Sequence, residues 1–219
     1  MKFKIKFFHL GGLIILLAIA SCAGGNKRDG EQEKLKGLTE NNGSTQMHKQ
    51  HNNLADNFAH KNIVILNEVY RVNEQTQSEL EEVIDAYLLM KDALVNDDVV
   101  ATDKAISVMN GKIKEVKPEK LDGEGLEAWE DHLRLYNDKL QEMRHVEGLE
   151  GKRSYFSHIS EIMYCTIKSF RLKQGDLYAV YCSNAIDDAG AYWISNTMDI
   201  KNPYTGMKVA PCGEIKELL

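Results

Sequence analysis

The sequence predicts a mainly α-helical fold, an up-and-down four-helix bundle that carries a small C-terminal β hairpin or irregular element. Apolar residues recur at spacings of three and four over most of residues 80–170, which is the period of one helix face. After Gly175 the chain becomes rich in aromatic and β-branched residues, which favour strands. The 219 residues, 43% hydrophobic and 27% charged, suit one moderate domain with appendages.

Four helices are expected, and their apolar stripes cover residues 80–95, 101–116, 126–143 and 156–170. Ser78 is the expected cap of the first helix, and the second ends before Pro118. The third has the most regular stripe, which consists of Leu126, Trp129, Leu133, Tyr136, Leu140 and Met143. Because the connections are short, consecutive helices should be antiparallel neighbours.

The C-terminal element should contain two strands and a turn. Leu177–Cys182 and Ala191–Ser195 are expected to form the hairpin, and residues 202–206 (Asn-Pro-Tyr-Thr-Gly) have the residue types of a turn. A piece of this size cannot be an independent domain, so its aromatic residues should bury against the bundle. Residues 62–72 are apolar but short, and they fit either a helical turn or a strand.

The N-terminus indicates export and lipidation. Residues 2–6 are basic and residues 7–20 are almost continuously apolar, which is the pattern of a signal peptide over residues 1–21. Residues 19–22 (Ile-Ala-Ser-Cys) resemble the lipobox of bacterial lipoproteins, with Cys22 as the lipidated first mature residue. The alternative is an ordinary signal peptide cleaved near Ala20. We expect a lipid-anchored protein of the cell envelope, at the outer membrane and facing the periplasm or the cell surface, because Ala23 is not an inner-membrane retention signal.

Residues 22–61 are expected to be a flexible tether, and residues 62–219 the folded part. The tether is rich in Gly, Asn, Glu and Lys, and such a segment cannot offset the entropy of ordering itself. His48, His51 and His60 lie in its distal part. They fit a solvated polar stretch better than a metal site, because no Cys or carboxylate spacing accompanies them.

Charge and motifs exclude several function classes. The net charge of −6 becomes −9 without the three lysines of the signal peptide, which is the wrong sign for a nucleic-acid binder. The sequence contains no motif of a hydrolase, nucleotide-binding or zinc-protease site. His132, His145 and His158 lie beside the apolar stripes, where a position on the surface or at the edge of the bundle is expected. We therefore expect a non-enzymatic binding or accessory protein.

Several sequence blocks resemble one protein family: residues 87–98, 156–163, 180–182, 190–195, 200–206 and 212–217. The family is a domain of unassigned function from Bacteroidetes, found in periplasmic lipoproteins and as the C-terminal module of copper and silver efflux adaptor (membrane-fusion) proteins. The resemblance covers roughly residues 75–219. It implies a helical bundle with a short β element and a role in binding heavy-metal ions such as Cu(I) or Ag(I).

The family pattern also implies a set of soft ligands, which select Cu(I) over harder ions. This chain keeps two of them, Cys182 and Cys212, and Met207 lies close enough in sequence to serve as a third. Met163, Cys165, His158 and Met198 also lie near the retained parts, and neither they nor Met207 occupy a matching position. The remaining family positions hold different residues, namely Ser183-Asn184, Val209 and Tyr155.

Two hypotheses for the cysteines follow. In one, Cys182, Cys212 and Met207 bind Cu(I) or Ag(I) and pass it to an efflux system. In the other, Cys182 and Cys212 form a structural disulfide, which the oxidising compartment of an exported protein favours. The protein would then be an interaction module that docks onto an efflux adaptor or another envelope protein through its aromatic residues, above all Tyr181, Trp193 and Tyr204. Cys165 is expected to be a half-buried structural thiol.

Overall fold

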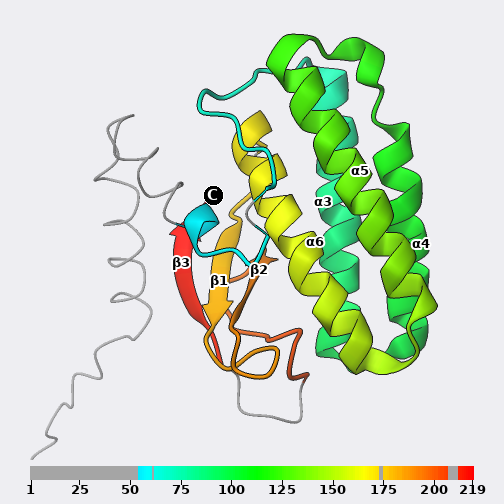
Figure 1. Ribbon diagram of the computed structural model, residues 1–219, viewed down its shortest axis with the longest axis vertical. Helices are drawn as coiled ribbons and strands as arrows, with labels where there is room; N and C mark the ends of the chain where they lie inside the picture. Colours follow the sequence, from blue (N-terminus) through cyan, green and yellow to red (C-terminus); the bar gives the residue numbers. More distant parts are fainter. Residues whose placement is uncertain (1–53, 61, 173–174, 207–211) are drawn as a thin grey trace, which may run out of the picture.

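A computed structural model describes residues 54–60, 62–172, 175–206 and 212–219. Four long helices and a small sheet account for most of these residues, so the predicted four-helix bundle with a C-terminal β element is confirmed (Figure 1). The helices are α3 (Glu74–Val95), α4 (Val99–Glu115), α5 (Gly123–His145) and α6 (Gly148–Phe170), with a short 3-10 helix, η1 (Pro118–Lys120), before α5. The strands are β1 (Tyr178–Cys182), β2 (Ala191–Ser195) and β3 (Glu214–Leu218).

Side-chain caps define where two of the helices begin. The side chain of Asn73 accepts a hydrogen bond of 2.9 Å from the backbone N–H of Thr76, so α3 begins one and a half turns before the expected Ser78. Asp98 accepts an equivalent bond of 2.9 Å from Ala101 and begins α4. The helices therefore start where a polar side chain satisfies a free N–H group, which lies upstream of the first apolar residue of each stripe.

The bundle core follows the predicted stripes with adjustments on α5. Trp129, Tyr136, Leu140 and Met143 are all buried, as expected. Leu126 and Leu133, by contrast, are only partly buried at the edge of the core. His132, which neighbours Leu133 on the helix, is instead completely buried, whereas the sequence indicated a position on the surface or at the bundle edge.

The sheet has the strand order β2-β1-β3, and both pairs are antiparallel. The predicted hairpin is confirmed, with Val180 opposite Trp193 and Tyr181 opposite Tyr192. Strand β3 was not expected from the sequence, and it pairs with the other edge of β1. All five residues of β2 are buried, because this strand packs against α6 (Figure 1).

Residues 62–73 form neither a helix nor a strand, and part of this segment is held along the bundle. The backbone N–H of Tyr70 donates to the carbonyl of Ser169 at 2.9 Å, and that of Leu66 donates to the Ser169 hydroxyl at 3.1 Å. The short apolar run is thus an irregular segment whose backbone N–H groups donate hydrogen bonds to the end of α6.

The folded part begins earlier than expected. Residues 54–60 fall within the range assigned to the tether, yet Leu54 and Phe58 are buried, with 8% and 2% of their surfaces exposed. The Phe58 ring packs edge-on against Tyr164 and Tyr192, with centroids 5.2 and 5.3 Å away. The distal end of the expected tether therefore needs correction, because two large apolar side chains anchor it over α6 and the sheet. The rest of the tether and the lipidation residue Cys22 lie outside the described residues.

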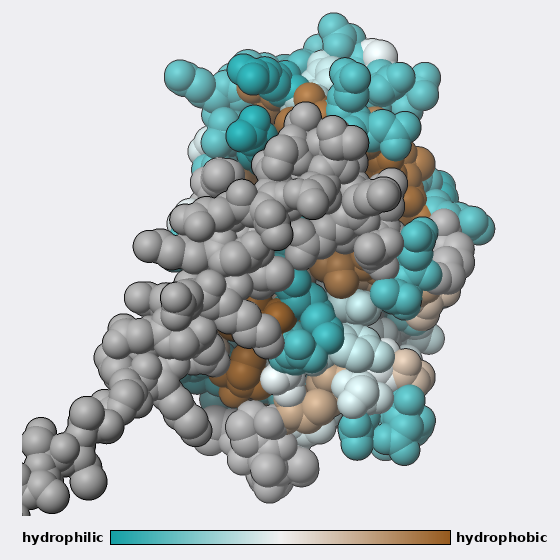
Figure 2. All heavy atoms as spheres, turned by 90° about the vertical axis from the view of Figure 1, so that its left-hand side faces the viewer, coloured by the Kyte–Doolittle hydropathy of each residue, from teal (hydrophilic) through white to brown (hydrophobic). Residues whose placement is uncertain are grey.

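Figure 2 shows the left-hand side of Figure 1, where the sheet lies. Hydrophilic residues dominate the outer part of this face, and hydrophobic ones show in its middle beside the grey atoms (Figure 2). Among the described residues, no helix is both long and apolar enough to cross a membrane.

Candidate functional site

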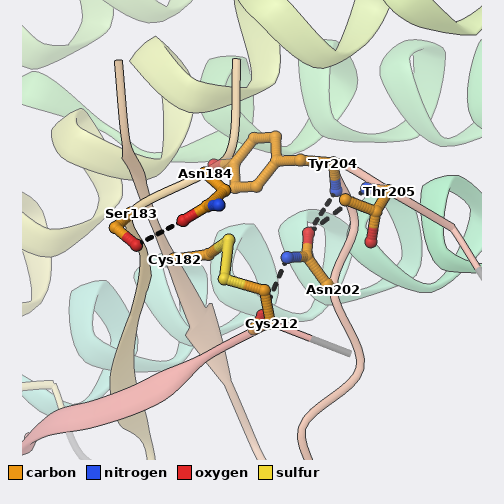
Figure 3. Close-up of a disulfide and its surroundings, with 7 residues drawn as sticks. All are labelled: Cys182, Ser183, Asn184, Asn202, Tyr204, Thr205 and Cys212. Atoms are coloured by element: carbon orange, nitrogen blue, oxygen red, sulfur yellow. Dashed lines mark hydrogen bonds between the residues drawn. A yellow bond between two sulfur atoms is a disulfide. The ribbon is translucent and has the colours of Figure 1, made fainter. Parts of the chain in front are cut away.

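A disulfide joins Cys182, the last residue of β1, to Cys212, which lies two residues before β3 (Figure 3). Their Cα atoms are 5.4 Å apart, and Cys182 is 1% exposed. The bond closes a loop that contains β2 and the turn at residues 202–206. The predicted disulfide is therefore present, and in this state neither sulfur is a thiolate that could bind a metal ion.

Asn202 organises the turn beside the disulfide (Figure 3). Its side-chain oxygen accepts hydrogen bonds from the backbone N–H groups of Tyr204 and Thr205, at 2.7 and 3.3 Å. Its side-chain nitrogen donates to the carbonyl of Cys212 at 2.8 Å. A single buried amide thus shapes the turn and connects it to the disulfide, which gives the asparagine of the Asn-Pro-Tyr-Thr-Gly motif a structural role.

A network of buried hydroxyl groups connects this element to the bundle. Tyr204 donates to the carbonyl of Tyr192, and its hydroxyl lies 3.5 Å from that of Ser160 on α6. Tyr87 on α3 lies 2.7 Å from the same serine hydroxyl and accepts a bond of 3.0 Å from the N–H of Ile194. Burial raises the pKa of both tyrosines, so their hydroxyl groups stay protonated as donors.

Burial corrects the expected interaction surface. Trp193 is 0% exposed and Tyr204 is 7% exposed, so neither side chain forms an accessible surface in this fold. Tyr181 is half-buried and packs against Tyr192 with ring centroids 4.6 Å apart. These aromatic residues fill the space between the sheet and the helices, because an element this small has no separate core in which to bury them.

Arg153 on α6 joins the same turn to the end of α3. Its guanidinium donates to Asp97 at 2.5 Å, to the carbonyl of Leu94 at 3.0 Å and to the carbonyl of Pro203 at 2.8 Å. Gly206 closes the turn with a φ of +67°, and a Cβ there would come within 2.2 Å of the Asp97 carboxylate. The turn therefore needs glycine at this position for both its conformation and its close packing.

A second cluster lies where residues 54–60 meet α6. Glu161 is buried, with 5% of its surface exposed. Its carboxylate accepts hydrogen bonds from the backbone N–H groups of Ala59 and His60, at 2.8 and 3.1 Å, and from His60 Nδ1 at 2.8 Å. His60 is thus not part of a solvated tether, and the buried carboxylate that holds it was not singled out from the sequence.

His158 completes this cluster. Its ring contacts that of His60, with centroids 3.6 Å apart, and its Nδ1 is buried without a hydrogen-bond partner in the described part of the chain. The pKa of His158 is lowered to about 4. Burial is the largest cause, the neighbouring His60 and Lys139 also lower the pKa, and Glu142 raises it by less. At neutral pH His158 is therefore uncharged, and its half-buried position agrees with the expected edge of the bundle.

Two other polar side chains, those of His132 and Cys165, are buried in the core. His132 Nε2 donates to the carbonyl of Val64 at 2.7 Å, and its Nδ1 lies 3.1 Å from the Thr166 hydroxyl. Burial lowers the pKa of His132, so it stays neutral inside the bundle. Cys165 is a free thiol, 1% exposed and thus more buried than expected, and burial raises its pKa. Such a thiol is unreactive.

Two of the proposed metal ligands, Cys182 and Cys212, are brought together, but as a disulfide. Among residues 54–60, 62–172, 175–206 and 212–219, no three His, Cys, Asp or Glu side chains form a cluster that could hold a metal ion. Met207 lies outside these ranges. Met163 lies in the core, where its sulfur is 3.8 Å from the Tyr136 hydroxyl.

Residues 83–175 match the model of one protein family, described as "Protein of unknown function (DUF3347)". Comparison with curated proteins gives no match, and comparison with solved structures gives none either. The matched residues run from the third turn of α3 through α4, α5 and α6 and end before β1, so the disulfide lies outside them. Residues 83–175, which hold most of the helical bundle, are therefore similar to the DUF3347 family.

Proposed function

We propose that this protein is a non-enzymatic accessory lipoprotein of the cell envelope that binds a partner protein, with Cys182–Cys212 as a structural disulfide. The disulfide is the observation that carries the proposal, because its sulfurs are bonded to each other and Cys182 is buried. Hydrogen bonds from Asn202, Tyr204 and Arg153 attach this element to its surroundings. Such bonds support a structural role for the element and do not form a ligand pocket.

The anchoring part of the proposal rests on the N-terminal sequence. Residues 1–21 have the pattern of a signal peptide, and Cys22 follows residues that resemble a lipobox. Two or more acyl chains on Cys22 would hold the protein stably to the outer membrane, whereas a single chain would not. The partner proposed is an efflux adaptor or another envelope protein, since the resembled family includes modules of such adaptors.

The non-enzymatic part of the proposal rests on the buried polar groups. Tyr87, Tyr204 and His132 each have a hydrogen-bond partner inside the fold, which accounts for their burial. Cys165 is buried with a raised pKa, which disfavours the thiolate that a nucleophile requires.

The competing function is the handling of Cu(I) or Ag(I) by Cys182, Cys212 and Met207. It requires the reduced form of the cysteine pair, since a thiolate binds these ions well and a disulfide sulfur does not. The two functions therefore differ in the oxidation state of Cys182 and Cys212 in the cell.

One experiment separates them. Protein is isolated from the envelope under alkylating conditions, digested without reductant and analysed by mass spectrometry, and its copper content is measured in parallel. The proposal expects a peptide pair joining Cys182 to Cys212, an alkylated Cys165 after unfolding, and no copper. Near-stoichiometric copper with both thiols free would establish the metal function instead. A Cu(I) competition titration of the reduced protein, with Cys165→Ser as the matched control, then measures whether the thiols bind copper at all.

Anchoring is tested separately with Cys22→Ser. This substitution removes the lipidated residue, so the protein should leave the membrane fraction or accumulate as an unprocessed precursor. A Cys22→Ser protein that is processed and fractionates with membranes like the parent would refute the lipid anchor.

A further inference from the structure

A groove between α4 and α5 has the properties of a small-molecule site. It has a volume of about 290 Å³ and lies between two helices that run side by side in Figure 1. Ile106 and Leu140 line it, with 0% and 2% of their surfaces exposed, and form its apolar floor. This volume is close to the lower end of the range for ligand pockets, so it suits one small molecule.

The groove has a cation near each end. Lys114 is the next-to-last residue of α4, and Arg144 is the next-to-last residue of α5. Because the short connection makes α4 and α5 antiparallel neighbours, Lys114 and Arg144 lie toward opposite ends of the groove that both of them line. The positive charges stand out on a chain whose net charge is −6.

Neither cation is neutralised within the described part of the chain. Neighbouring basic residues on the same helices do form ion pairs: Lys112 with Glu82 and Glu115, and Lys139 with Glu142. For Lys114 and Arg144, the described residues provide no such partner, and the residues lining the groove include no Asp or Glu. The groove is therefore suited to carboxylate groups near both ends.

Three amide side chains line the groove as well: Asn110 on α4, and Asn137 and Gln141 on α5. Each amide can both donate and accept hydrogen bonds, so together they can pair with hydroxyl groups of either orientation. His145, beside Arg144, is turned toward the helix backbone by a 2.7 Å contact between its Nδ1 and the carbonyl of Gln141.

We propose that this groove binds an elongated, polyhydroxylated dicarboxylate. Lys114 and Arg144 would each pair with one terminal carboxylate, and the three amides would bind the hydroxyl groups between them. The carbon chain would lie over Ile106 and Leu140, which exclude water from one side. This site lies on the opposite flank of α5 from the Cys182–Cys212 element, and its occupation does not depend on the function proposed above.

The test is a calorimetric titration of the purified protein with three matched probes. Glucarate has two carboxylates and four hydroxyl groups, adipate has the same chain length without the hydroxyl groups, and glucitol has the hydroxyl groups without charge. We expect saturable binding of glucarate with a Kd of about 1 mM or lower, and affinities about tenfold lower or worse for adipate and glucitol. Absence of saturable glucarate binding would overturn the proposal, and equal binding of adipate would overturn the role of the amides.

Two variants locate the binding. Lys114→Gln and Arg144→Gln each remove one charge from an exposed position, so neither should impair folding. Each should weaken glucarate binding about tenfold, which corresponds to the loss of one charged hydrogen bond. Lys104→Gln, which removes an exposed lysine of α4 that does not line the groove, is the matched control and should leave the affinity unchanged. Glucarate binding that survives in the double variant Lys114→Gln/Arg144→Gln would show that the ligand lies elsewhere.

Discussion

The imidazole ring of His60 lies against that of His158, with centroids 3.6 Å apart, at the point where the N-terminal segment meets α6. Beneath them, the buried Glu161 carboxylate accepts three hydrogen bonds from Ala59 and His60. This small cluster holds Ala59 and His60 to α6. The stability of this cluster depends on pH, since protonation of the half-buried His158 ring is unfavourable.

Acidification should destabilise the protein through His158. Its pKa is about 4 in the folded protein and about 6.5 when unfolded, so the unfolded state binds more protons between these values. Stability from this group is present above pH 6.5 and is lost as the pH falls toward 4. We expect the His158→Gln variant to lose less stability than the parent between pH 7 and pH 5, by about 1 kcal/mol after allowance for solvent screening. Urea unfolding at both pH values measures this difference.

The control for that measurement is His145→Gln, which removes an exposed histidine. It should show the same pH dependence as the parent. Identical pH profiles for the parent and His158→Gln would mean that the buried ring does not govern the acid sensitivity.

Glu161→Gln should release the N-terminal segment from α6. An amide oxygen cannot replace both carboxylate oxygens that hold Ala59 and His60, so the variant leaves at least one polar group without its bond. We expect a loss of about 1–3 kcal/mol and faster hydrogen exchange at these two backbone amides. Glu127→Gln, at an exposed position on α5, should change neither quantity. Unchanged exchange at Ala59 in Glu161→Gln would refute this role of the carboxylate.

Loss of the disulfide should lower the free energy of unfolding by about 3–4 kcal/mol, because the unfolded chain is no longer cross-linked across a loop of this length. Cys212→Ser tests this by chemical denaturation, and reductant should affect the parent but not the variant. Cys165→Ser is a useful comparison, since that thiol is free and any loss there reflects core packing alone. A parent whose stability does not respond to reductant would contradict the prediction.

Tyr204→Phe should cost about 1–2 kcal/mol, because it leaves the buried carbonyl of Tyr192 without its donor. The ring itself stays in place, so the melting temperature should fall without loss of cooperativity. Tyr155→Phe provides a matched change at a half-buried tyrosine that is not part of this network. If both variants melt alike, the hydrogen bond of Tyr204 contributes nothing measurable.

Helices α3 to α6 could be predicted because their apolar residues repeat with the period of a helix, and this information is local in the sequence. The four stripes identify the bundle, and the third places Trp129 and Tyr136 correctly in its core. The hairpin of β1 and β2 was predictable for the same reason, since β-branched and aromatic runs flank a turn. The disulfide was one of the hypotheses for the cysteine pair, and the expected export of the chain favoured it.

The tertiary structure alone decided which polar side chains are buried and what they hold. Glu161 binds Ala59 and His60 from about 100 positions away in the sequence. Strand β3 likewise pairs with β1, although β2 and the turn at residues 202–206 lie between them in the sequence. His132 looked like a surface residue because its partner, the carbonyl of Val64, belongs to an irregular segment without periodicity. Helix periodicity reports only neighbours one turn apart, whereas these contacts depend on where distant backbone groups come to lie. For that reason the sequence determined the bundle by itself, and only the packed fold decided how its ends and its sheet are attached.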